Sequence, residues 1–128
     1  MAEGVILLGH GSRRAEANEE IRQISRMVAD LNPGLYETAF LSFCSPNLAE
    51  AVVKLKQAGA VKIIITPIFL ANGNHIALDI PEEIEGLKSD FPDVEFLVAD
   101  HIGPDPGVAE IVKERIVQAR AKMSAKAV

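Results

Sequence analysis

Residues 61–70 read Val-Lys-Ile-Ile-Ile-Thr-Pro-Ile-Phe-Leu, which is the most hydrophobic stretch of the chain. A long apolar run of this kind is typical of a β-strand buried on both faces, as in a parallel sheet covered by helices. Pro67 must then lie near an end of the strand, where a missing N–H donor is tolerated. Residues 4–9 contain a second such run, Val-Ile-Leu-Leu between two glycines. The sequence therefore predicts two central strands, Gly4–Gly9 and Val61–Leu70.

Two weaker strands and four amphipathic segments fill the rest of the chain. The strands are expected at Tyr36–Phe43 and Val94–Ala99, where polar residues interrupt the apolar ones. In the first helical segment, Ile21, Ile24, Val28 and Leu31 recur at spacings of three and four and predict one buried face. Ser45 before Pro46 is typical of a helix cap and first turn, and Gly59 ends that helix. The predicted helices begin near Arg13, Pro46, Pro81 and Pro106.

Strands and helices alternate, with short connections between them. This order favours a parallel sheet with right-handed crossovers and helices on both faces, an α/β fold. Numbering the strands along the chain, we expect the order 2-1-3-4, in which strands 1 and 3 are neighbours. The 128 residues suffice for one domain, residues 1–128, and residues from about 121 to 128 are expected to fray.

Composition excludes several classes of protein. The formal charge is −5, with no tryptophan and one tyrosine, so little is available to neutralise phosphates or stack on bases, and nucleic acid is not an expected partner. No apolar run approaches the roughly 20 residues needed to span a bilayer, and the start of the chain lacks the basic segment of a signal peptide. We expect a cytoplasmic protein without membrane contact. The single cysteine, Cys44, allows no thiolate cluster, so any metal must be held by nitrogen and oxygen.

The only three histidines, His10, His75 and His101, each follow a predicted strand. Ligands of open α/β sheets bind outside the carboxyl ends of the strands, and His10 and His75 flank the point where the strand order reverses. Two imidazoles without a thiolate suit cobalt, nickel, iron or zinc, and they leave coordination positions open. His101 lies one strand further out and is a weaker candidate.

The turn Gly9-His10-Gly11-Ser12-Arg13 joins the first strand to the first helix. Free backbone N–H groups there can face an anion, and Arg13 and Arg14 can bind carboxylates or phosphates. A tight turn with a solvated histidine explains the same residues equally well. A phosphate site is a further alternative, although the turn lacks a Walker lysine and Gly9 replaces the arginine of an Arg-His-Gly phosphatase motif.

The loop 67–81 combines apolar and small polar residues around His75. Its apolar side chains could form a wall for a flat hydrophobic ligand, or they could simply complete the core. Asp79 could orient His75 as a hydrogen-bonded carboxylate, although a charge at a helix start is the simpler role. Cys44 is expected to pack as a small hydrophobe.

These segments resemble the short, single-domain class II tetrapyrrole chelatases. The resemblance rests on Leu7 to Arg13, on Pro67 to Leu70 leading to Gly73-Asn74-His75, on Asp79-Ile80-Pro81, and on His101 to Asp105. The motifs occur in order, and with the helices between them they cover nearly the whole chain.

The resemblance implies a homodimer that binds a sirohydrochlorin-type tetrapyrrole in a cleft between its subunits. It implies that His10 and His75 bind the incoming metal, and that one of them accepts protons from the pyrrole nitrogens. The divalent metal, Co²⁺ above Ni²⁺ or Fe²⁺, is then a substrate, and no permanently bound cofactor is expected. The implied activity is insertion of cobalt into sirohydrochlorin on the route to cobamides. The residues expected to contact the macrocycle are Ser12, Arg13, Arg14, Phe69, Leu70, Ala71, Asn72, Gly73, Asn74 and Ile76, with Asp79 and His101 behind them.

The chain also departs from this family. Ser42 and Ser45 stand where many members carry acidic residues, and residues 86–93 lack the histidine-rich insertion of some members. Three alternatives stay open: insertion of nickel or iron, a metal-binding or delivery protein without catalysis, and a phosphate- or nucleotide-binding module.

Overall fold

The structure is a four-stranded parallel sheet in the order β2-β1-β3-β4. The computed structural model describes residues 2–126, except for the side chains of His75 and residues 124–126. The strands are β1 (Ala2–Gly9), β2 (Leu35–Phe40), β3 (Ala60–Pro67) and β4 (Glu95–Val98). The predicted strand order and parallel arrangement are confirmed, and Pro67 is the last residue of its strand.

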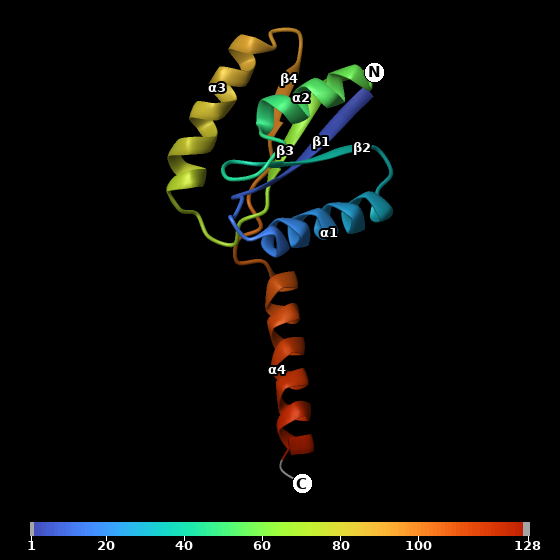
Figure 1. Ribbon diagram of the computed structural model, residues 1–128, viewed down its shortest axis with the longest axis vertical. Helices are drawn as coiled ribbons and strands as arrows, with labels where there is room; N and C mark the ends of the chain where they lie inside the picture. The colour runs from blue at the N-terminus through green and yellow to red at the C-terminus, as the bar shows by residue number, and fades with distance from the viewer. Residues whose placement is uncertain (1, 127–128) are drawn as a thin grey trace.

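The helices of the described chain are α1 (Ala15–Leu31), α2 (Leu48–Gln57), α3 (Ile80–Asp90) and α4 (Pro106–Lys126). A π-helical turn, His75–Asp79, runs directly into α3. Figure 1 shows α2 and α3 on one side of the sheet and α1 on the other. Within the described residues, no helix is long and apolar enough to cross a membrane.

The main core lies between the sheet and the pair α2 and α3. Ile6, Leu8, Ile63 and Ile65 point to this side and are fully buried. Leu48, Val52 and Leu55 from α2 meet them, together with Ile80, Ile84 and Leu87 from α3. This face explains why the central strands are so uniformly apolar.

The opposite face is only partly covered, by α1. Ser25 of α1 is buried there and accepts a hydrogen bond from Thr38 Oγ1 of β2 at 2.8 Å. The prediction that Ile24 and Leu31 belong to a buried helix face is wrong, because Leu31 is 85% exposed and Ile24 is 39% exposed. The residues that α1 buries most are polar, Asn18 and Ser25, because they approach the loop after β1 and the polar strand β2.

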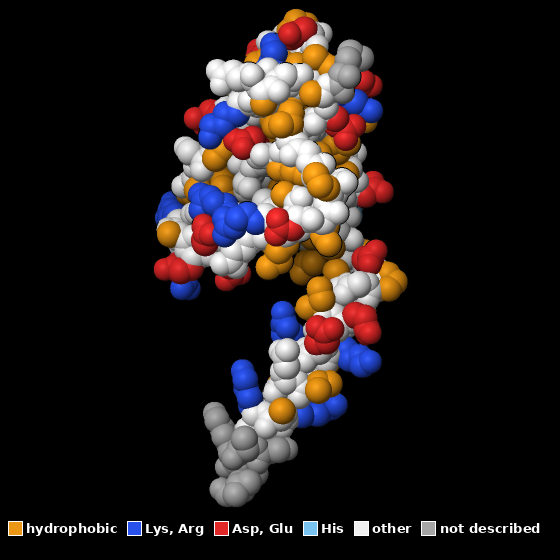
Figure 2. Space-filling view, turned by 90° about the vertical axis from the view of Figure 1, so that its right-hand side faces the viewer, with side chains coloured by type: hydrophobic (Ala, Val, Ile, Leu, Met, Phe, Trp, Pro, Cys, Tyr) orange, Lys and Arg blue, Asp and Glu red, His pale blue; other side chains and the backbone are white. Residues whose placement is uncertain are grey.

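The last helix, α4, runs away from the body of the molecule (Figure 1). Asp105 caps it by accepting a hydrogen bond from Gly107 N at 2.7 Å, and the helix begins at Pro106, as the sequence predicts. The helix continues through Lys126, over most of the stretch in which the sequence predicts fraying. Figure 2 shows hydrophobic side chains where α4 leaves the body and along its surface.

The predicted start of α2 is two residues too early. Asn47, not Ser45, caps this helix: its side chain accepts from Glu50 N at 2.9 Å, and the Glu50 carboxylate accepts from Asn47 N at 3.0 Å. This reciprocal pair satisfies two N–H groups at the helix start, which a single serine hydroxyl cannot do. The Ser45–Pro46 peptide is cis and lies outside the helix. The strand before it also ends earlier than predicted, at Phe40.

Candidate active site

The loop after β1 is held tightly against the end of β2. Leu41 N donates to Gly9 O at 3.1 Å and Ser42 N donates to His10 O at 3.0 Å, so the two segments stay paired beyond the strands. Gly11 has φ +86°, and a Cβ added to it would lie 1.7 Å from the carbonyl oxygen of Ser42. Only glycine fits there, because other residues rarely adopt this conformation and have a Cβ that the space excludes.

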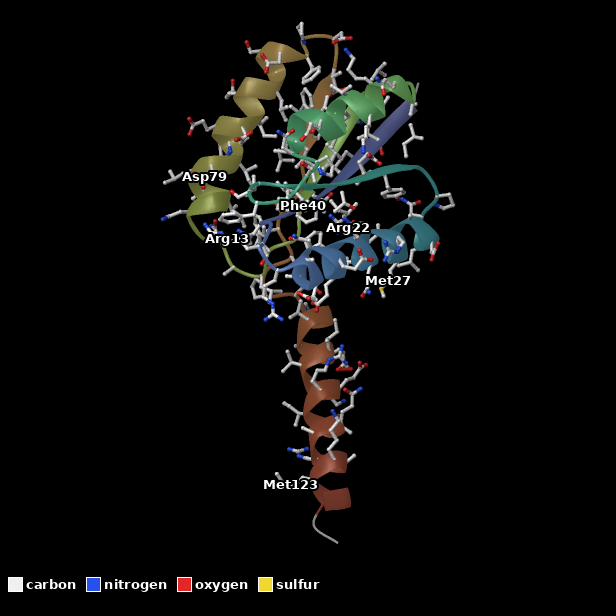
Figure 3. All side chains as sticks on the ribbon, viewed as in Figure 1. Arg13, Arg22, Met27, Phe40, Asp79 and Met123 are labelled. Atoms are coloured by element: carbon white, nitrogen blue, oxygen red, sulfur yellow. The ribbon has the colours of Figure 1, made fainter. Side chains whose placement is uncertain are left out.

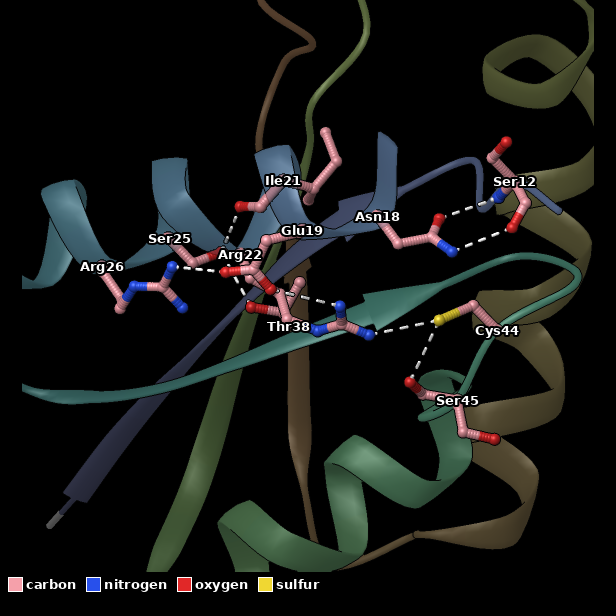
Figure 4. A network of polar contacts seen from close by, with 10 residues as sticks. All are labelled: Ser12, Asn18, Glu19, Ile21, Arg22, Ser25, Arg26, Thr38, Cys44 and Ser45. Atoms are coloured by element: carbon pink, nitrogen blue, oxygen red, sulfur yellow. Dashed lines mark hydrogen bonds and ion pairs between the residues drawn. The ribbon is translucent and has the colours of Figure 1, made fainter. Parts of the chain in front are cut away.

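A buried asparagine fixes the next residue of the loop. Asn18 of α1 accepts from Ser12 N at 2.9 Å and donates to Ser12 O at 2.8 Å (Figure 4). The Ser12 hydroxyl in turn accepts from Arg14 N at 3.0 Å. The turn that carries His10 is therefore held on both sides, by β2 and by α1.

His10 is exposed and lies beside Phe69, with the ring centroids 4.0 Å apart. Ile68 N donates to Leu8 O at 2.9 Å, which keeps the segment after β3 close to the end of β1. The two segments enclose a pocket of about 200 Å³, lined by His10, Phe69, Leu70, Ala71, Gly73 and Ile76. An imidazole beside an apolar, aromatic wall can bind a metal ion or accept a proton next to a flat ligand.

His75 belongs to the segment that closes this pocket. Ile76 N and Ala77 N both donate to Gly73 O, at 3.1 and 3.0 Å, and begin the turn that leads into α3. Ile76 lines the pocket and His75 directly precedes it in the chain, while the side chain of His75 lies outside the described residues. Its role as a second ligand stays a prediction.

The two predicted anion-binding arginines differ in their contacts. The guanidinium of Arg13 lies over the ring of Phe43, 4.9 Å from its centroid, whereas Arg14 forms an exposed ion pair with Glu16 at 3.6 Å. Phe43 is 66% exposed and has φ +65°. Figure 3 places Arg13 at the same end of the sheet as Asp79. Arg13 thus contacts an exposed aromatic ring, and Arg14 is partly neutralised.

A second, larger cavity lies beside the first. It measures about 490 Å³ between the loop after β2 and α3, and its wall includes Ser42, Asp79, Glu82, Glu83 and Asp90. Ser42 joins this cavity to the His10 loop through its backbone hydrogen bond. Among the side chains that the structure describes, no three His, Cys, Asp or Glu residues form a group that could hold a metal ion. These carboxylates therefore line a wall rather than form a closed metal centre.

The remaining predicted residues lie at the margin of the pocket. Asn72 and Asn74 are exposed and do not line it. His101 is half-buried, and its ring lies over Gly103, where an added Cβ would be 3.2 Å from Nε2. The loop that carries His101 is attached to the site, because Ile102 N donates to Phe69 O at 3.1 Å.

A polar network borders the site on the side of α1 (Figure 4). Arg22 donates to Cys44 Sγ at 3.3 Å and pairs with Glu19 at 3.5 Å, and Arg26 donates to Glu19 at 2.6 Å. The hydrogen bond from Arg26, followed by the charges of Arg26 and Arg22, holds the pKa of Glu19 below its usual value. Cys44 also donates to Ser45 O at 3.4 Å, so the prediction of an apolar packing role is wrong: its thiol lies among polar groups.

Sequence reasoning missed Asn18 and Phe43 as parts of this site, and it included Gly11 as part of the turn without its close contact with Ser42. Asn18 and Ser25 share the helix face of Ile21 and Val28, at spacings of three and four, and this position could have indicated that a polar group is buried there. The conformation of Phe43 has no comparable signal in the sequence.

The chain is an α/β protein with an open parallel sheet and a histidine pocket at its carboxyl edge, which is where proteins of this class bind small ligands. The chain belongs to the CbiX family, whose model matches residues 4–119. It is 33% identical to the sirohydrochlorin cobaltochelatase of Methanopyrus kandleri, over 90% of this chain and 95% of that one. It is also 33% identical to a sirohydrochlorin ferrochelatase of Priestia megaterium, over 89% of this chain but 43% of the relative. The sirohydrochlorin chelatase SirB from Bacillus subtilis subspecies spizizenii, solved in complex with cobalt, superposes with a TM-score of 0.87 at 27% identity, over 92% of this chain and 51% of that one.

Proposed function

We propose that this protein inserts a divalent metal ion, Co²⁺ in first place, into sirohydrochlorin. The observation that carries the proposal is the pocket in which the exposed imidazole of His10 lies beside Phe69 and the apolar segment 70–76. The family and the relatives named sirohydrochlorin chelatases, over nearly the full chain, support the choice of substrate.

The reaction needs a ligand for the metal and a base for the macrocycle. Each divalent ion that enters the ring replaces two N–H protons, so two protons must leave for every metal bound. A neutral imidazole can perform either task near pH 7, because its usual pKa is about 6.5. In this proposal His10 and His75 hold the metal in an open site. One of them accepts the two pyrrole protons in turn, and passes each to water, as the metal passes to the ring nitrogens.

The macrocycle is flat, and its edge carries carboxylates. Phe69, Leu70 and Ile76 offer it an apolar wall, while Arg13 and the N–H groups at the start of α1 offer its carboxylates a counter-charge. Arg13 is exposed and stacks on Phe43, so its guanidinium stays accessible to a carboxylate at this end of the sheet. Asp79, Glu82 and Glu83 line the neighbouring cavity, where they can attract the metal ion before it reaches His10.

The wall of the pocket is formed mostly by two segments of one chain, and its outer side is open. A second subunit facing this edge would close the cleft around the macrocycle, so the proposed active form is a homodimer. The name of the relative from Priestia megaterium supports iron as an alternative metal, and nickel stays a further candidate. The proposed location is the cytoplasm.

The decisive experiment follows the absorbance spectrum of sirohydrochlorin under anaerobic conditions with Co²⁺, Ni²⁺ and Fe²⁺ in turn. Insertion should be faster than the uncatalysed rate, and fastest with Co²⁺. His10→Ala and His75→Ala should each lower the rate at least about 100-fold, the scale typical of a lost acid–base or ligand group. Gln57→Ala, an exposed change at the far end of α2, serves as the control and should leave the rate unchanged.

A protein that only carries metal would behave differently. It would bind Co²⁺, detected by calorimetry, and lose this binding in His10→Ala, yet it would not accelerate the spectral change with any of the three metals. That result would overturn the proposed chelatase activity.

A further inference from the structure

Phe43 differs from the other aromatic residues of the described chain in its exposure. Of the five phenylalanines and one tyrosine, the other five are buried or half-buried, whereas Phe43 is 66% exposed. Phe43 also has φ +65°, in the left-handed region that bulky residues avoid. This conformation costs free energy, and an exposed ring regains none of it by burial. Strained residues of this kind cluster at ligand-binding sites.

The conformation of Phe43 is imposed by the residues on either side of it. Before it, Ser42 N donates to His10 O at 3.0 Å. After it, Cys44 Sγ accepts a hydrogen bond from Arg22 at 3.3 Å (Figure 4). Both neighbours are therefore tied to other segments, and the ring of Phe43 is held outward between them.

The loop of His10 lies between two aromatic residues. In the strand order β2-β1-β3, His10 follows the middle strand, Phe69 follows β3 and Phe43 follows β2. The ring of Phe69 contacts the imidazole at 4.0 Å and is only 4% exposed, so most of its surface is used to support His10. The aromatic surface that is accessible to a ligand at this edge belongs to Phe43.

A cation lies over the ring of Phe43. The guanidinium carbon of Arg13 is 4.9 Å from the ring centroid, and both side chains are exposed. The cation–π contact keeps the guanidinium beside the ring, and its N–H groups remain able to bind a carboxylate. An aromatic surface and a carboxylate-binding group thus lie side by side. Together they match a flat conjugated ring whose edge carries carboxylates.

We propose that Phe43 is a substrate-contacting residue: its ring stacks on the macrocycle on the β2 side of His10, while Arg13 binds a carboxylate at the edge of the same macrocycle. This inference rests on the proposed function. A macrocycle that receives its metal at His10 extends to both sides of this residue, and the end of β2 is one strand spacing away, about 5 Å. The fixed loop holds the ring in place before the substrate arrives, so that little further ordering is needed on binding.

Binding of metal-free sirohydrochlorin, followed anaerobically by its fluorescence, tests this contact without metal insertion. Phe43→Leu keeps an apolar side chain but removes the ring, and it should raise the Kd about 3- to 10-fold, as expected for one lost stacking contact. Phe43→Tyr keeps the ring and should bind within about 2-fold of the unchanged chain.

Phe91→Leu is the matched control. Phe91 also has a cation over its ring, with Lys56 Nζ 5.5 Å from the centroid. It lies at the opposite edge of the sheet, because its carbonyl accepts from Val94 N directly before β4 begins. Loss of this ring should leave the Kd for sirohydrochlorin unchanged.

Phe43→Asn separates a substrate contact from a structural role. Asparagine adopts positive φ more readily than phenylalanine, so the Tm should stay the same or rise. The Kd for sirohydrochlorin should nevertheless rise about 10-fold, because the ring is lost. A Tm that falls together with the affinity would show that the ring stabilises the chain, and would overturn the inference.

The remaining outcomes separate this inference from the proposed function. An unchanged Kd in Phe43→Leu and Phe43→Asn would overturn the contact and leave the proposed function in place. No binding by the unchanged chain would overturn the proposed function, and this inference with it. Light scattering on the same samples tests whether the ring contacts another subunit instead. A loss of affinity that occurs only with a change in molecular mass would assign the ring to that contact and overturn the inference.

Discussion

The two faces of the sheet are built from the same strands but are covered by helices to different extents. Toward α2 and α3, Ile63 and Ile65 are fully buried in a continuous core. Toward α1, the alternate residue Ile64 is only half-buried and its neighbour Leu97 is exposed. The first face can stabilise a single chain, whereas the second leaves apolar surface for association. The apolar core of the single chain therefore lies on one side of these strands, and apolar surface stays exposed on the other.

Adjacent residues of β3 provide the sharpest test of this comparison. Ile65→Ala removes a fully buried side chain and should lower the free energy of unfolding by about 2–5 kcal/mol. Ile64→Ala, one position along, should cost about 1 kcal/mol in dilute protein because its side chain is only half-buried. Urea unfolding at low concentration measures both values. Equal losses would show that the two faces do not differ in this way.

The close approach at Gly11 should give the next largest effect. Gly11→Ala forces a Cβ against the Ser42 carbonyl and strains the backbone at φ +86°, at a cost of about 1–3 kcal/mol. It should also displace the His10 loop and slow metal insertion. Gly86→Ala is the matched control: no atom lies within 4 Å of its added Cβ, and in the interior of α3 it should raise stability by about 0.5–1 kcal/mol. Thermal unfolding measures both, and a harmless Gly11→Ala would contradict the packing described.

The two hydrogen bonds between Asn18 and the Ser12 backbone should have an effect no larger than this. Asn18→Ala removes both hydrogen bonds to the Ser12 backbone and should cost about 1–3 kcal/mol, because two polar groups lose their partners. Amide hydrogen exchange at Ser12 should become faster. Asn18→Asp keeps the acceptor for Ser12 N and should protect this amide better than alanine does. Unchanged exchange in Asn18→Ala would show that the loop is held by β2 alone.

The exposed network around Glu19 should give the smallest effect, and it should depend on pH. The pKa of Glu19 is lowered in the folded chain, so its contribution to stability is present above the unfolded pKa, near 4.5, and is lost as the pH falls through the folded value. Chemical unfolding at pH 6, 4.5 and 3 should show a shallower loss in Glu19→Gln than in the unchanged chain. Identical pH profiles of the two proteins would show that the ion pairs of Glu19 do not contribute to the pH dependence of stability.

The fold could be predicted from the sequence largely because its strands are buried. The runs at 4–9 and 61–70 favour buried strands, and their alternation with helices favours a parallel sheet. The boundaries were less predictable where two local signals compete. Ser45-Pro46 and Asn47 with Glu50 both resemble a helix start, and only the second pair forms reciprocal hydrogen bonds. Propensity alone does not rank such alternatives.

The site was predictable in its residues but not in its support. The family resemblance implied that His10, Phe69 and Ile76 serve one ligand, and the structure places the three residues around one pocket. The hydrogen bonds between Asn18 and the Ser12 backbone, and the close contact between Gly11 and Ser42, join segments that are separated in the chain. No local sequence pattern therefore reveals them. The same reason applies to α1, whose apolar spacing predicts a buried face that this chain leaves exposed.

Pro67 determines where the hydrogen bonding between β3 and the chain after β4 ends. Ala99 N still donates to Ile65 O, but the next rung would need an N–H from residue 67, and proline has none. The chain is attached to this edge again only at Phe69 O, through Ile102. His101 lies in the short segment between these two hydrogen bonds, at residues 100–101. The missing N–H of Pro67 thus fixes the point at which the loop that carries His101 leaves the sheet.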